Sequence, residues 1–326
     1  MRSSLRFLDI AKTGINSPLR WFKVELFTFL WTFPSLVVVF PIAMIFGRSG
    51  VGDSKSMFET IKPSALALAV MLLPFLTLLY GLFRQVQRQH GRHWMTIITP
   101  NASINWSKMG VGAAVWGCIL LVDLGISYVL EPERFTWAFQ PVELLLTLIV
   151  AVTMIPFQAA AEELALRGYL MQTTALVSKR VWQPLLITSV SFGMLHYANP
   201  EVQAYGSVMM IHYIGMGLIW GITTLMDDGV ELAIGAHAAN NILAGLLVTE
   251  THSAFQTPSL FRLTSQQPSA WSLLLETAIP GCVFLFLVGK IYSWGSWKRL
   301  FAPIWDLPKP ENAEDTAVIN TDAVSE

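Results

Sequence analysis

The sequence predicts an all-α protein, a polytopic membrane helix bundle with about eight transmembrane helices. Of its 326 residues, 53% are hydrophobic and only 13% are charged, whereas soluble domains contain about 25% charged residues. The apolar residues also fall in runs close to the roughly 20 residues that a helix needs to cross a bilayer. These observations predict one membrane-embedded bundle rather than two soluble domains.

Eight apolar runs define the expected helices. They are Leu26 to Phe46, Ala65 to Phe83, Gly110 to Leu130, Val142 to Phe157, Trp182 to Ala198, Gly206 to Met226, Val230 to Val248 and Ser272 to Tyr292. If the N-terminus is cytoplasmic, most of the 21 Lys and Arg residues lie in cytoplasmic segments. The positive-inside rule therefore predicts that both termini are cytoplasmic.

Composition divides the chain into four parts. Residues 1–141 form an N-terminal membrane region with the first three helices, and residues 142–250 form a core with the next four. Residues 251–300 comprise an external loop, rich in Ser, Thr, Gln and Pro, and the last helix. Residues 301–326 are polar and acidic without periodicity, which predicts a disordered tail.

The stretch RQVQRQHGRHW, residues 84–94, is expected to be a basic cytoplasmic loop in which His90 and His93 contact water. The chain has no basic block with interleaved aromatic residues. No nucleic-acid partner is therefore expected.

Polar and ionisable residues cluster in one half of this apolar chain. An ionisable group inside a bilayer costs at least about 2.5 kcal/mol on insertion scales, so a cluster of them indicates a function. Between residues 160 and 245 the sequence contains Glu162, Glu163, Arg167, His196, His212, His237 and the amide pair Asn240 and Asn241.

The first motif is AEELALRGYL, residues 161–170. On a helix, Glu163 and Arg167 are four residues apart and can form an ion pair on one face. Glu162 lies about 100° around the helix from Glu163, so it is expected to be left free. The alternative is an ordinary ion pair at the start of an interfacial helix.

The second motif is FGMLHYANP, which contains His196. Lys179 lies 17 residues after Glu162 and 17 before His196. An antiparallel helical hairpin that turns near Lys179 would therefore bring the two side chains to the same level. Pro156 is the expected break or kink in the long helix that precedes this turn. The alternative is that His196 is a hydrogen-bonded core histidine.

The third motif is GAHAANNILAG, in which His237 and Asn241 are four residues apart and share a helix face. The small residues around them allow neighbouring helices to approach closely. The alternative is a hydrogen-bonding pair that only holds helices together.

Together these side chains can activate water. Glu162 can act as a general base while His196 orients the water or shares its proton. His237 and Asn241 can donate hydrogen bonds to an oxyanion, which suggests amide hydrolysis. A metal site remains an alternative, because one carboxylate and two imidazoles are the donors of His₂Glu zinc sites. No HExxH motif is present to fix two imidazoles on one helix.

The three motifs resemble those of a known family. EELALR resembles the EExxxR motif, FGMLH the FxxxH motif and HAANN the HxxxN motif of the CPBP family of intramembrane proteases. That family includes the eukaryotic CAAX prenyl endopeptidase and bacterial relatives. The motifs occur in the family's order, and the resemblance covers roughly Val142 to Val248.

The resemblance implies a role for each motif residue. Glu162 would be the catalytic glutamate and His196 its partner in activating water. His237 and Asn241 would form the oxyanion site. Glu163 and Arg167 would support these groups.

The resemblance also implies an intramembrane endopeptidase of the bacterial inner membrane that cleaves a membrane-associated protein or peptide. Whether the substrate is prenylated stays open. The family has been described both as metal-dependent and as using a glutamate without metal; the residues favour the second, with no required cofactor and zinc as the alternative. Two other functions stay open: a non-catalytic immunity or scaffold protein, and a transporter with a proton relay.

Overall fold

The computed structural model describes residues 6–35 and 64–304, and this part of the chain is mostly helical. The longer helices are α1 (Pro18–Leu30), α3 (Ala65–His90), α4 (Trp106–Leu130), α5 (Pro141–Glu163), α7 (Trp182–Leu195), α9 (Met210–Asp227), α10 (Glu231–Leu247) and α11 (Ala270–Ile291). Shorter helical segments are η1 (Asp9–Lys12), η3 (Trp94–Ile97), η4 (Pro132–Arg134), η5 (Leu164–Leu170), α6 (Met171–Ala175), α8 (Pro200–Tyr205), η6 (Ser207–Met209) and η7 (Trp297–Phe301).

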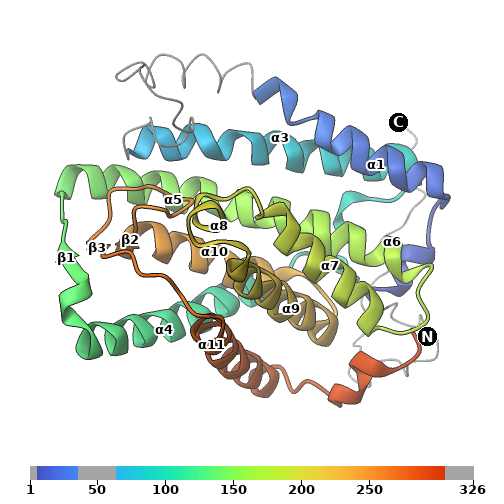
Figure 1. Cartoon of the computed structure of the whole chain (residues 1–326). Helices are drawn as coiled ribbons and strands as arrows, with labels where there is room; N and C mark the ends of the chain where they lie inside the picture. The colour runs from blue at the N-terminus through green and yellow to red at the C-terminus, as the bar shows by residue number, and fades with distance from the viewer. Residues whose placement is uncertain (1–5, 36–63, 305–326) are drawn as a thin grey trace.

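The bundle is arranged around α10. In Figure 1, α1 and α3 lie side by side along one side of the bundle, and α4 and α11 lie on the opposite side. Helix α10 packs against α4, α5 and α9, and residues 231–238 are all buried. Two glycines allow α4 and α10 to pack closely. A Cβ on Gly235 would meet the carbonyl oxygen of Met109, and a Cβ on Gly112 would meet the carbonyl oxygen of Leu232.

Local sequence signals begin and end several helices. Ser64, Asn105 and Ser269 precede α3, α4 and α11, and the side chain of each accepts a hydrogen bond from a backbone N–H of the first turn. Gly91 ends α3 in the left-handed conformation, at a φ of 65°.

Five helices of the described residues are long and apolar enough to cross a membrane. They are Ala65–His90, Trp106–Leu130, Pro141–Ala175, Ser207–Asp227 and Ala270–Ile291. The protein is therefore an integral membrane protein, with apolar outer faces such as those of α4 and α11 available for lipid. The predicted number of eight spans is not confirmed, because α7 has 14 residues and α10 has 17. Most of the first predicted run, Leu26 to Phe46, lies outside the described residues.

Three strands form a small sheet at one end of the bundle. Their order is β1 (Phe135–Trp137), β3 (Phe261–Leu263) and β2 (Val248–Thr249), with β3 antiparallel to β1 and parallel to β2. The predicted external loop thus contains β3, which joins the segment before α5 to the end of α10. The sheet therefore links α5, which carries Glu162 and Glu163, to α10, which carries His237.

The prediction of a basic loop at residues 84–94 was wrong for its first half. Residues 84–90 are the last turns of α3, because glutamine and arginine are good helix formers. His90 is fully buried rather than in contact with water. Its Nδ1 donates to the Ile15 carbonyl oxygen at 2.8 Å, and its Nε2 lies 2.9 Å from the Tyr169 hydroxyl.

The long helix is distorted after the glutamates rather than interrupted at Pro156. A continuous helical segment runs for 35 residues from Pro141 to Ala175, with Pro156 inside α5. The turns of η5 that follow Glu163 are π-helical. Single π turns inside α-helices occur frequently at functional sites.

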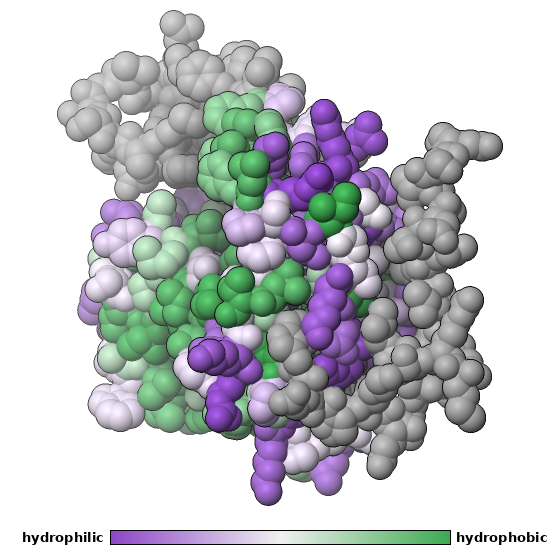
Figure 2. All heavy atoms as spheres, turned by 90° about the vertical axis from the view of Figure 1, so that its right-hand side faces the viewer, coloured by the Kyte–Doolittle hydropathy of each residue, from purple (hydrophilic) through white to green (hydrophobic). Residues whose placement is uncertain are grey.

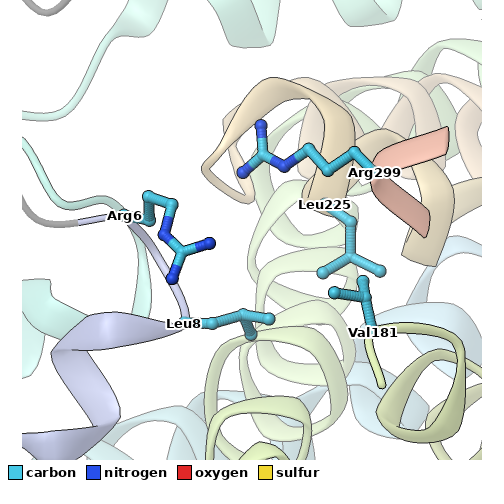
Figure 3. A pocket seen from close by; sticks show the side chains of 5 residues that line it. All are labelled: Arg6, Leu8, Val181, Leu225 and Arg299. Carbon is cyan, nitrogen blue, oxygen red and sulfur yellow. The ribbon is translucent and has the colours of Figure 1, made fainter. Parts of the chain in front are cut away.

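The two ends of the described chain meet at one end of the bundle, which faces the viewer in Figure 2 and carries hydrophilic side chains beside hydrophobic ones. A small pocket lies here, lined by Arg6, Leu8, Val181, Leu225 and Arg299 (Figure 3). None of the six predicted site residues lines it.

The described residues 301–304 of the predicted tail are part of the folded bundle. Ile304 is fully buried, and its backbone N–H donates to the Lys179 carbonyl oxygen at 3.1 Å. Residues 305–326 of the predicted tail lie outside the described residues.

Replacing Gly235 by alanine is expected to lower the free energy of unfolding by about 1 to 3 kcal/mol, because the added Cβ overlaps the Met109 carbonyl group of α4. Gly125→Ala is the control, since a Cβ there has no heavy atom within 4 Å. Thermal unfolding of the purified protein in detergent compares the two variants. Equal unfolding midpoints would contradict the close contact between α4 and α10.

Candidate active site

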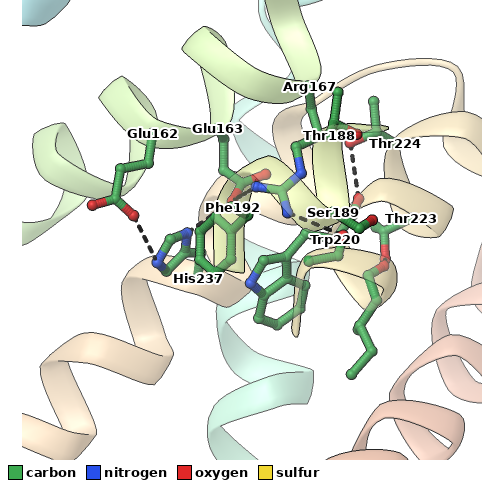
Figure 4. Close-up of polar contacts among 12 residues, drawn as sticks. Glu162, Glu163, Arg167, Thr188, Ser189, Phe192, Trp220, Thr223, Thr224 and His237 are labelled. Atoms are coloured by element: carbon green, nitrogen blue, oxygen red, sulfur yellow. Dashed lines mark hydrogen bonds and ion pairs between the residues drawn. The ribbon is translucent and has the colours of Figure 1, made fainter. Parts of the chain in front are cut away.

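The centre of the polar cluster is the buried carboxylate of Glu163. Its Oε1 atom accepts a hydrogen bond from Arg167 Nη1 at 2.9 Å and another from His237 Nδ1 at 2.8 Å. The side chains of Glu163 and Arg167 are fully buried, and that of His237 is 5% exposed. The expected Glu163–Arg167 ion pair is thus present, and His237 of α10 shares the same acceptor oxygen (Figure 4).

Arg167 extends this cluster to two further helices. Its Nη2 atom donates to the Gly217 carbonyl oxygen of α9 at 3.0 Å, and its guanidinium lies 4.7 Å from the ring centroid of Phe192 on α7. Gly217 packs against the backbone of Ser189, so α9 approaches α7 closely at this level. The arginine therefore holds α7 and α9 against the end of α5.

Glu162 has a different environment from its neighbour. Its Oε1 atom accepts a hydrogen bond from Gln158 Nε2 at 2.6 Å. Its Oε2 atom is buried, has no hydrogen-bond partner among the described residues and lies 3.6 Å from His237 Nε2. That separation is too long for a direct hydrogen bond but is within the range of an ion pair when His237 is protonated.

The two carboxylates lie on either side of the His237 ring (Figure 4). Nδ1 carries a hydrogen, because its partner is a carboxylate oxygen, which only accepts. The ring of Trp220 stacks on His237 at 6.2 Å between centroids, with an interplanar angle of 16°. His237 is therefore fixed in both orientation and tautomer at Nδ1.

His196 lies at the end of α7, one turn after Phe192. Its Nδ1 atom donates to the Phe192 carbonyl oxygen at 2.7 Å, which leaves Nε2 as the acceptor of the neutral ring. The ring stacks on Tyr213 at 4.4 Å between centroids. Among the described residues no ion pair or hydrogen bond joins His196 to Glu162.

The expected pairing of Glu162 with His196 is therefore not present as a direct contact. The hairpin exists, since α6 and η5 pack against α7. His237, from a helix farther along the chain, is the histidine that faces Glu162. The hairpin spacing could not reveal this, because it contains no information about where α10 packs.

Asn241 lies on the same face of α10 as His237, as the spacing predicted. Its Nδ2 atom donates to Gln158 Oε1 at 2.9 Å, and its Oδ1 atom accepts from Asn240 Nδ2 at 3.0 Å. Asn241 is thus linked to Glu162 by hydrogen bonds through Gln158. The second N–H of the Asn241 amide can donate to another acceptor. Gln158 was not among the predicted site residues, although it lies four residues before Glu162 on one helix face.

The described residues contain no group of three His, Cys, Asp or Glu side chains that could hold a metal ion. Both nitrogens of His237 face carboxylates. This arrangement of His237 therefore does not fit a His₂Glu zinc site.

A bundle of membrane helices that encloses two carboxylates, an arginine and a histidine in one cluster defines an integral membrane protein with ionisable groups inside the bundle. Residues 142–243 match the family model of type II CAAX prenyl endopeptidase, Rce1-like. The matched region contains all six predicted site residues, so this part of the chain is similar to CAAX-type intramembrane proteases.

A curated relative extends the similarity. The chain is 32% identical over 190 residues to the uncharacterized protein YyaK of Bacillus subtilis (strain 168). The aligned region is 58% of this chain and 63% of that protein. The chain thus spans less than two thirds of the length of this relative.

The two glutamates are expected to differ in their effect on stability. Glu163→Gln leaves the Arg167 guanidinium buried without its counter-ion, which is expected to cost about 3 to 5 kcal/mol. Glu162→Gln keeps an acceptor for Gln158 at a partly exposed position, so its effect is expected to be about 1 kcal/mol or less. Thermal unfolding in detergent or nanodiscs measures both; a larger loss for Glu162→Gln would contradict the assignment of Glu163 as the structural carboxylate.

Proposed function

We propose that the protein is an intramembrane endopeptidase that hydrolyses a peptide bond with water activated by Glu162. One observation carries this proposal: Glu162 is 14% exposed, its Oε1 atom is held by Gln158, and its Oε2 atom has no hydrogen-bond partner among the described residues. An acceptor in this state is suited to take a proton from water. The Oε2 atom of Glu163 also has no partner there, but that side chain is fully buried and paired with Arg167. The match of residues 142–243 to the Rce1-like family model supports the reaction class.

In the proposed reaction, a water oxygen attacks the carbonyl carbon of the substrate while one of its protons passes to Glu162 Oε2. His196 accepts a hydrogen bond from the same water at Nε2, the ring nitrogen not used by the Phe192 carbonyl group. The proton on Glu162 then passes to the leaving nitrogen as the C–N bond breaks. The products are a carboxyl group and an amine.

The oxyanion of the tetrahedral intermediate needs donors, and α10 is the proposed source. The protonated form of His237 would donate from Nε2, which faces the space beside Glu162 Oε2. Asn241 would donate through the amide N–H that is not bonded to Gln158. Removing a single such donor typically reduces kcat by about 10² to 10³-fold.

Glu163 and Arg167 support these groups without touching the substrate. Glu163 accepts from His237 Nδ1, which keeps Nε2 pointed at Glu162. Arg167 neutralises Glu163, so the remaining negative charge of the pair is on Glu162.

The proposed substrate is a membrane-associated protein or peptide, because the catalytic carboxylate lies on a helix long and apolar enough to cross the bilayer. The proposed location is the bacterial inner membrane with both termini cytoplasmic. The matched family is described as a prenyl endopeptidase. Prenylated and unprenylated versions of one peptide are therefore the informative pair of test substrates.

Glu162→Gln and His196→Gln are each expected to reduce cleavage by about 10² to 10⁴-fold, because each removes a group that handles the water proton. Cleavage of a peptide panel by purified protein in liposomes, followed by mass spectrometry, is the measurement. Glu143→Gln makes the same substitution in the first turn of α5 and should retain activity. Full activity in Glu162→Gln would refute the proposal.

Cleavage is also expected to continue after treatment with a metal chelator, since the proposed steps use only protein side chains and water. The same peptide assay is run before and after chelation, with metal analysis of the active sample. Loss of activity on chelation that zinc restores would overturn the metal-free mechanism while leaving the endopeptidase assignment in place.

A further inference from the structure

A continuous chain of hydrogen bonds runs from α4 through α10 to the proposed base on α5. The indole Nε1 of Trp116 donates to Asn240 Oδ1 at 3.1 Å, and Asn240 Nδ2 donates to Asn241 Oδ1 at 3.0 Å. Asn241 Nδ2 donates to Gln158 Oε1 at 2.9 Å, and Gln158 Nε2 donates to Glu162 Oε1 at 2.6 Å. Four bonds therefore connect an indole to the carboxylate.

The direction of this chain is fixed by its two ends. Each amide could in principle be turned by 180°, which would exchange its oxygen and nitrogen. The indole N–H of Trp116 can only donate, and the ionised carboxylate of Glu162 can only accept. One orientation of the three amides satisfies both ends, and it presents an N–H of Gln158 to Glu162.

The surroundings hold the chain in place. Trp116 is 2% exposed and Gln158 is 3% exposed. The Trp116 ring packs against Trp220 and Phe284 at centroid distances of 4.8 and 5.4 Å. In such an apolar setting hydrogen bonds are strong and polarise one another.

We propose that Gln158 is a positioning residue, oriented from Trp116 through the two asparagines, that fixes Glu162 Oε1 and thereby directs Oε2 toward the reacting water. This inference rests on the proposed function, because it gives Gln158 its role through the base Glu162. It assigns three further functional residues, Gln158, Asn240 and Trp116. None of them touches the substrate.

A merely structural role for the amides predicts a different outcome. Residues that only hold α4, α5 and α10 together would change stability when replaced and leave the turnover of the folded enzyme unchanged. A positioning chain lowers kcat with little change in KM, because the misplaced group acts in the transition state. In such a chain the effects on kcat of substitutions at two residues that do not touch each other are also not additive.

The kinetic experiment compares Gln158→Met, Trp116→Phe and the double variant in the liposome cleavage assay. Gln158→Met is expected to lower kcat about 10- to 100-fold with KM within about twofold, since small misplacements of reacting groups can cost about 100-fold. Trp116→Phe is expected to lower kcat about 3- to 10-fold, and the double variant should match Gln158→Met alone. If the two effects multiply, or if KM changes instead of kcat, the proposal is overturned.

Thr147→Val is the matched control, because Thr147 is buried on the same helix and its hydroxyl donates only to the Glu143 carbonyl oxygen. It should retain the wild-type kcat. If Trp116→Phe does not fold, Asn240→Leu breaks the chain one step later and replaces it in the cycle. Multiplying effects in that cycle would overturn the proposal equally.

A spectroscopic readout tests the chain independently of peptidase activity. In protein labelled with ¹⁵N-tryptophan, the indole N–H resonance of Trp116 is assigned by its loss in Trp116→Phe. It is expected to shift in Gln158→Met and to stay in place in Thr147→Val. An unchanged resonance in Gln158→Met would overturn the chain, whereas a shift in a protein without detectable cleavage would keep the chain and reject the proposed function.

Discussion

The buried carboxylate of Glu163 joins helices that lie far apart in the sequence. One oxygen of this group accepts hydrogen bonds from Arg167 within the same long helix and from His237 on α10. Arg167 in turn contacts α7 and α9, so four helical segments meet around one charge. Removing either member of such a buried pair leaves an uncompensated charge, which is the costly outcome inside an apolar bundle.

This arrangement explains why the adjacent residues Glu162 and Glu163 have different environments. Glu163 is fully buried and paired with Arg167, whereas the side chain of Glu162 is 14% exposed and its Oε1 atom accepts from Gln158. Their different directions follow from the 100° step of the helix. The π-helical turns of η5 begin directly after them, so the helix changes its geometry at the point where its polar residues meet α10.

Local spacing predicted the parts of the site that lie on single helices. The Glu163–Arg167 pair and the shared face of His237 and Asn241 both follow from a separation of four residues. Gln158 obeys the same rule with Glu162, and a search for amides one turn from the motif would have identified it. The hairpin between Glu162 and His196 was also predicted from sequence distance.

The relative placement of helices could not be predicted in the same way. The approach of His237 to both glutamates depends on how α10 packs against α4 and α5, which glycines such as Gly235 and Gly112 permit but do not specify. The π-helical turns of η5 have no signal in the hydrophobic pattern. The burial of His90 was missed because a basic stretch can continue a helix as well as form a loop.

Glu163 couples α5 to α10 through its contact with His237, and a double-mutant cycle on stability measures this coupling directly. Glu163→Gln, His237→Gln and the double variant are unfolded thermally in nanodiscs, and their free energies are compared. A coupling of about 1 kcal/mol or more is expected, because both replacements remove the same buried contact. Additive effects within about 0.5 kcal/mol would show that the two side chains act independently and would contradict this role of Glu163.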